Sequence, residues 1–152
     1  MPLRSILCAC LLALLAWGGS ASVHAQDVLI PMNNQQANHL KAYGAIYMTL
    51  QKGQKVDWLL NFQGGSFLTR ASNTVLQELR TRGVTFQEIG GAEASKIIAE
   101  VEADGSNMAL VPLEKAPKIA VYAPSGAVPW DDAVRLALEY ADVPHDIIYD
   151  DA

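Results

Sequence analysis

The hydrophobic pattern of this chain switches repeatedly between the short apolar runs of buried strands and the three- to four-residue spacing of amphipathic helices. Strands are predicted at residues 28–30, 56–62, 84–89, 119–122 and 145–149. Helices are predicted between them, at residues 37–50, 72–82, 94–101 and 129–141. This alternation predicts an α/β fold with a mainly parallel open sheet, built by right-handed crossovers.

Local signals mark where the predicted helices begin and end. Asn33 or Asn34 is a suitable N-cap for the first helix, and Gly53 supplies its stop. Ser72 or Asn73 caps the second helix. The last helix is predicted to open with a proline at its first position, where the missing N–H costs nothing.

A proline-containing segment at residues 106–117 divides the chain into two parts. Pro112 and Pro117 prevent long regular structure, so this segment is predicted to be a connector. An N-terminal α/β unit is predicted at 26–105, and a single strand-helix-strand unit at 118–152. A segment below about 40 residues rarely folds alone without a disulfide or metal. We therefore expect the second unit to be incomplete and to leave apolar strand residues uncovered.

The first 25 residues have the pattern of a signal peptide. Arg4 precedes an apolar stretch at 6–17, and the small residues Val23 and Ala25 fit cleavage before Gln26. The stretch is too short to cross a bilayer comfortably, although an uncleaved N-terminal anchor would have the same composition. The sequence thus predicts an exported protein, periplasmic or extracellular, that is not an integral membrane protein after cleavage.

Composition excludes several chemistries. Both cysteines, Cys8 and Cys10, lie in the predicted signal peptide, so the remaining chain offers no disulfide, thiolate ligand or cysteine nucleophile. The formal net charge is −5, and the chain has no cluster of lysines and arginines that could bind along a phosphate backbone. Nucleic acid is therefore not an expected partner, and no cofactor is expected.

The segment NFQGGSFLTR, residues 61–70, places two glycines and a serine at the end of a predicted strand. No lysine follows Gly65 closely, as a phosphate-binding Walker loop requires. A nucleophile elbow would need glycine where Leu68 stands. Two interpretations remain: a structural turn, or a loop in which Gly64, Gly65 and Ser66 line a site for a small polar ligand at the carboxyl end of a strand.

Histidines and acidic residues give weaker signals. His39 has no histidine or carboxylate four residues further along its helix, so an exposed helix residue is favoured over a metal ligand. His145 stands near four aspartates that could suggest a metal site: Asp142, Asp146, Asp150 and Asp151. Because strand side chains alternate between faces, these residues need not converge, and a solvated strand end is favoured. No metal site is predicted.

Four short segments carry a family resemblance. They are NHLKAYG at 38–44, GGSF at 64–67, APKIAVY at 116–122 and PWDDAV at 129–134. With these segments the chain resembles the opening part of an exported bacterial family often labelled asparagine synthetase B. Members are typically longer, and their later part resembles a glutamine amidotransferase-like, flavodoxin-type domain. The resemblance implies that residues 118–152 hold the first unit of that domain, that this chain is a truncated member, and that any catalytic nucleophile lies beyond Ala152.

The chemistry in the family label is not matched by these residues. Glutamine-dependent asparagine synthesis needs an N-terminal cysteine nucleophile and a pyrophosphatase loop of the S-G-G-x-D-S kind, and neither occurs after Ala25. No catalytic residue is therefore assigned, and enzyme activity stays an open question. One hypothesis is a non-catalytic module that binds a ligand or partner and associates with itself through its C-terminal unit. The alternative is a fragment of a glutamine amidotransferase-like or amidohydrolase enzyme.

Overall fold

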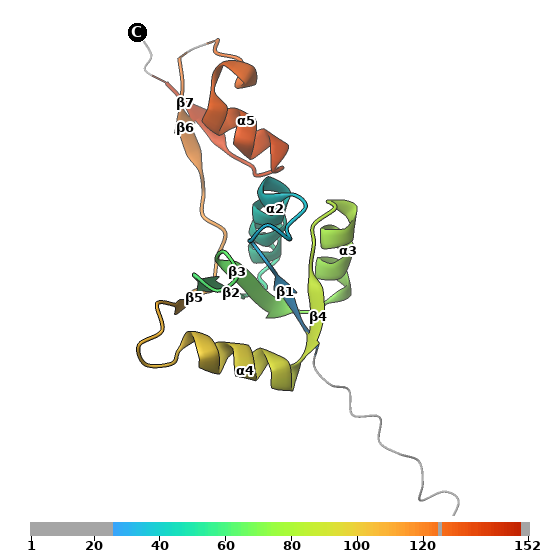
Figure 1. The fold of residues 1–152 in the computed structure, drawn as a ribbon. Coiled ribbons are helices and arrows are strands. Elements are labelled where there is room, and N and C mark those ends of the chain that lie inside the picture. The colour runs from blue at the N-terminus through green and yellow to red at the C-terminus, as the bar shows by residue number, and fades with distance from the viewer. Residues whose placement is uncertain (1–25, 125, 150–152) are drawn as a thin grey trace, which may run out of the picture.

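A computed structural model describes residues 26–124 and 126–149 (Figure 1). The predicted signal peptide, residues 1–25, lies outside this described part. The strands are β1 (Gln26–Ile30), β2 (Val56–Leu60), β3 (Ser66–Arg70), β4 (Gln87–Gly90), β5 (Ala109–Leu113), β6 (Ala120–Tyr122) and β7 (Asp146–Ile148). The helices are α2 (His39–Gln51), α3 (Asn73–Thr81), α4 (Gly91–Val101) and α5 (Ala133–Tyr140), with a 3-10 turn η1 (Pro129–Asp131). No helix in these ranges has the length and apolar character needed to cross a membrane.

Five strands form one sheet in the order β4-β1-β3-β2-β5, and every neighbouring pair is antiparallel. The prediction of a mainly parallel open sheet was therefore wrong. β1 and β2 do run in the same direction, as a strand-helix-strand unit requires, because both are antiparallel to β3. The sequence interpretation missed β3, which forms a hairpin with β2 and then inserts between β2 and β1. The result is a split strand-helix-strand arrangement.

Helices cover both faces of this sheet (Figure 1). On one face, residues such as Val28 and Val56 pack with buried side chains of α2 and α3. On the other face, Leu29, Leu59 and Leu68 pack against α4. Consecutive residues of one strand thus enter different cores, as the alternation of side chains along a strand demands.

The predicted connector 106–117 contains β5, which pairs with β2 at the edge of the sheet. Pro112 stands opposite Asp57 in this pairing. Proline has no N–H to donate, but an edge strand has one side without a neighbour, so proline is tolerated there. Pro112 is therefore compatible with a strand at the edge of the sheet, and part of the predicted connector is a strand.

The remaining elements form a separate unit in which β6 and β7 pair in parallel as a two-stranded sheet, with α5 between them in the chain. Pro129 opens the turn η1, and α5 begins only after Asp132, whose side chain accepts hydrogen bonds from the main-chain N–H of Val134 and Arg135. The predicted opening of the helix at Pro129 was therefore early by one turn. This C-terminal unit lies against the N-terminal half of α2 through α5 (Figure 1).

Candidate functional site

The glycine-serine segment singled out from the sequence is the turn of the β2–β3 hairpin. Gly64 and Gly65 both have positive φ, 82° and 89°. A β-carbon on Gly64 would lie 2.5 Å from the main-chain oxygen of Met32, so the turn packs directly on the segment that follows β1. The main-chain N–H of Met32 also donates to the carbonyl of Gln63 at 3.0 Å. Glycine is thus required here by both conformation and contact.

Several polar groups of this turn bond within the chain, although the side-chain amide oxygen of Gln63 is buried without a hydrogen-bond partner among the described residues. Ser66 is fully buried, and its hydroxyl donates to the carbonyl of Phe62 at 3.0 Å. The carbonyl of Gly65 accepts the indole N–H of Trp58 at 3.0 Å. The turn therefore fixes the position of Trp58 and, one residue beyond Ser66, of Phe67. These contacts favour the structural interpretation of the turn and point to an adjacent site.

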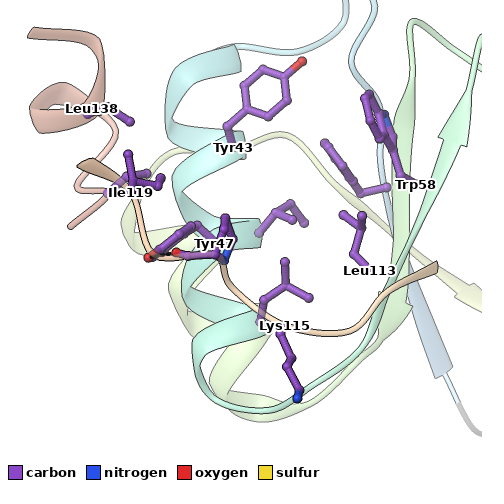
Figure 2. A pocket seen from close by; sticks show the side chains of 12 residues that line it. Tyr43, Tyr47, Trp58, Leu113, Lys115, Ile119 and Leu138 are labelled. Atoms are coloured by element: carbon purple, nitrogen blue, oxygen red, sulfur yellow. Dashed lines mark hydrogen bonds between the residues drawn. The ribbon is translucent and has the colours of Figure 1, made fainter. Parts of the chain in front are cut away.

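That site is a cavity of about 390 Å³ between the sheet, α2 and the C-terminal unit (Figure 2). It is lined by Tyr43, Ile46, Tyr47, Leu50, Trp58, Phe67, Leu113, Lys115, Pro117, Ile119, Leu138 and Val143. Four parts of the chain contribute: α2, the β2–β3 hairpin, the end of β5 with the residues that follow it, and the C-terminal unit. The volume lies in the range of small-molecule sites.

Aromatic side chains build the wall formed by the sheet and α2. The rings of Trp58 and Phe67 stack with centroids 6.0 Å apart, and Tyr43 meets Phe67 edge-on at 5.8 Å. The hydroxyl of Tyr47 donates to the carbonyl of Pro117 at 2.8 Å, and the indole N–H is already bonded to the turn. Most of the wall therefore offers carbon atoms, which suits an apolar ligand.

The histidines and aspartates considered as metal ligands do not converge. A ring nitrogen of His39 lies 3.1 Å from the carbonyl of Met32, and one of His145 lies 3.1 Å from the carbonyl of Val143. Within residues 26–124 and 126–149, no group of three histidine, cysteine or acidic side chains could hold a metal ion. Asp150 and Asp151 lie outside these ranges.

A second recess opens on the α4 face of the sheet. Asp27, Asp57 and Arg70 line it, and the Nε atom of Arg70 lies 3.7 Å from Asp27. Burial raises the pKa of the Asp57 carboxyl, and the nearby carboxylates of Asp27 and Glu102 raise it further. The hydroxyls of Thr69 and Ser95 also line the recess, but both donate to main-chain carbonyls and not to a carboxylate, so the recess gives no activated nucleophile.

Comparison with protein-family models, with curated proteins and with solved structures gave no match.

The sequence did not identify the cavity: Tyr43 and Tyr47 fall within the helix predicted at 37–50, and Leu113 within the predicted connector 106–117. The one sequence feature that points to the cavity is the pair Tyr43 and Tyr47, four residues apart on one helix face. These tyrosines form a cavity wall only together with β3 and β5, and neither strand was predicted from the sequence.

Proposed function

We propose that this chain is a non-catalytic, exported binding module, corresponding to the N-terminal part of the family that it resembles, and that it holds a small, mainly apolar ligand. The observation that carries the proposal is the cavity between α2, the hairpin and the C-terminal unit, with its stacked Trp58 and Phe67. A volume of about 390 Å³ with an aromatic wall is suited to a ligand of one ring with a short chain. The small polar ligand predicted at Gly64, Gly65 and Ser66 stays a prediction.

The chemistry of the described residues supports binding over catalysis. The hydroxyl of Ser66 is buried and bonded to a main-chain carbonyl, and no histidine or carboxylate is bonded to it. Neither cysteine of the chain lies after residue 25, so a thiol nucleophile is not available to the two units. A purified chain that released ammonia from glutamine would favour the alternative, an amidotransferase-like enzyme fragment.

Calorimetric titration with 4-phenyl-1-butanol tests the proposed cavity. Leu138 and Leu136 offer a matched pair on α5, since Leu138 lines the cavity and Leu136 is half exposed elsewhere on the helix. Leu138→Trp should fill part of the cavity and weaken binding about tenfold or more, which corresponds to about 1.4 kcal/mol. Leu136→Trp should leave the affinity unchanged. Equal effects of the two substitutions, or no binding by the unaltered chain, would refute the proposed function.

A second surface supports self-association. Ile147 and Ile148 are neighbours in β7, so their side chains face opposite sides of the two-stranded sheet, yet they remain 42% and 51% exposed. Parallel strands are normally covered on both faces, and a two-stranded sheet has two open edges. We propose that a second copy of the chain covers these apolar residues.

A further inference from the structure

The cavity has a basic rim. The aliphatic stem of Lys115 lines the cavity, and its ammonium group points outward from it (Figure 2). A further recess continues from this point, sharing Tyr47, Lys115 and Pro117 with the cavity and adding Lys118. An apolar interior therefore opens directly onto two lysines.

The charges around this rim are not balanced. Glu114 lines the recess as well, but its carboxylate lies 2.6 Å from Lys55 and is therefore already matched. Asp146 lines a neighbouring recess with Lys118 and forms no ion pair with it. Across the described residues, neither Lys115 nor Lys118 is paired with a carboxylate. An anion placed at the rim would gain two cations without displacing an existing partner.

The volume limits the apolar part of the ligand. A dry apolar cavity of about 150 Å³ is enough to bind benzene, and this cavity measures about 390 Å³. One ring with a short chain therefore fits, and the chain can reach the rim. Tyr43 also lines the cavity, but its hydroxyl can bond to an alcohol as well as to an acid, so it does not select for charge.

We infer that the ligand is an apolar carboxylate, held with its ring or branched body among Tyr43, Trp58 and Leu113 and its carboxylate at Lys115 and Lys118. This inference rests on the proposed function and adds the chemical class of the ligand. The apolar body supplies most of the affinity, because it leaves water for an aromatic wall. The exposed lysines supply a smaller, salt-dependent preference for the acid.

Two probes of nearly equal size separate these contributions. We expect 4-phenylbutyrate to bind about three- to fivefold more tightly than 4-phenyl-1-butanol at low ionic strength, as one or two exposed ion pairs allow. The preference should largely disappear in about 0.5 M NaCl, where exposed charges are screened. Lys115→Gln should reduce the preference for the acid, and Lys115→Gln with Lys118→Gln should abolish it. The readout is the ratio of the two affinities, because the stem of Lys115 also lines the cavity and its change affects both probes alike.

Lys96→Gln is the matched control, because it removes the same charge from α4, on the other face of the sheet. It should leave the preference for the acid intact. Equal binding of the two probes, or an equal effect of Lys96→Gln and Lys115→Gln, would overturn the inference while leaving the proposed function standing. Failure of both probes to bind would overturn both.

Discussion

Gly44, in the middle of α2, lies against the main-chain carbonyl of Ala141 so closely that a β-carbon at position 44 would be 1.8 Å from the carbonyl oxygen. Glycine inside a helix costs about 0.5–1 kcal/mol relative to alanine. Here it provides the space into which the end of α5 fits. The contact joins the C-terminal unit to the sheet unit, and so it also positions Leu138 and Val143 at the cavity.

Gly44→Ala should therefore weaken the docking of the C-terminal unit, even though alanine is the better helix former. The clash involves main-chain atoms, which cannot rotate away as a flexible side chain can. We expect faster amide exchange in α5 and β7 and weaker binding of 4-phenyl-1-butanol, with little change in the exchange of β1 and β3. Hydrogen exchange measured by NMR would report all of these elements in one sample.

Gly90→Ala provides the control for this prediction. A β-carbon on Gly90 would have no neighbour within 4 Å, and its φ of −77° suits any residue. This substitution should leave α5 and β7 unchanged. Unaltered exchange of α5 in Gly44→Ala would show that the contact does not hold the two units together.

An ion-pair cluster strengthens the same contact. The carboxylate of Asp142 lies 2.7 Å from both Lys41 and Arg82, and Arg82 also donates to the carbonyl of Ala141 at 3.0 Å. The hydrogen bond from Lys41, with the attraction of both cations, lowers the pKa of the Asp142 carboxyl. The ionised Asp142 therefore contributes its full stabilisation of the folded state above the pKa of an unfolded aspartate, about 3.9. This stabilisation is lost as the pH falls through the lower pKa that Asp142 has in the folded chain.

Asp142→Asn should modestly reduce the protection of α5 against amide hydrogen exchange at neutral pH. The effect is small because the Asp142 side chain is 53% exposed, and exposed ion pairs contribute about 0.2–1 kcal/mol. Asparagine tolerates the positive φ of 55° at this position, so the change tests charge rather than conformation. The difference between variant and unaltered chain should vanish well below pH 4. Asp104→Asn removes an exposed carboxylate beyond α4 and should show no such difference. A difference that persisted in acid would contradict the electrostatic explanation.

The helices were more predictable than the sheet. Ser72 does cap α3 through its hydroxyl, and the predicted stripe at 94–101 lies within α4. The predicted cap of the first helix at Asn33 or Asn34 was wrong, because Asn38 caps α2 by accepting from the main-chain N–H of Lys41. By contrast, Ser66–Thr69 are all buried because β3 is central and covered on both faces, so the alternation that reveals a strand is absent. The two glycines before it suggested an end of regular structure, whereas they form the tight turn of a hairpin.

The candidate site could not be predicted because its walls come from distant parts of the chain. Trp58 and Phe67 come together only through the hairpin register that pairs them. Ile119 and Val143 reach the cavity only because the C-terminal unit docks on α2 through Gly44. Neither the register nor the docking leaves a local pattern of hydrophobicity or charge.

The tight packing of the hairpin turn gives a comparison between two glycines. Gly64 and Gly53 have nearly the same φ, 82° and 78°, but only Gly64 faces main-chain atoms, those of Met32 and Asn33. Gly53→Ala should cost about 1–2 kcal/mol in the free energy of unfolding, from the left-handed conformation alone. Gly64→Ala should cost about 1–3 kcal/mol more, the usual range for overpacking. Urea denaturation would measure both costs, and equal costs would show that the turn can move away from Met32.

The last prediction concerns the apolar surface of the C-terminal unit. Ile147 and Ile148 on β7 are 42% and 51% exposed, and burying each in a second copy would contribute favourable free energy of transfer from water. If copies associate through these residues, Ile147→Lys and Ile148→Lys should each shift the chain toward monomer in sedimentation equilibrium, because a buried unpaired ammonium is costly.

Ala99→Lys adds the same charge at an exposed position of α4 and serves as the control. It should leave the association constant unchanged, apart from a general effect of net charge that salt removes. The binding of 4-phenyl-1-butanol should survive Ile148→Lys, since Ile148 does not line the cavity. A chain that stays monomeric at all accessible concentrations, before any substitution, would rule out self-association and leave the cavity as the binding surface of this module.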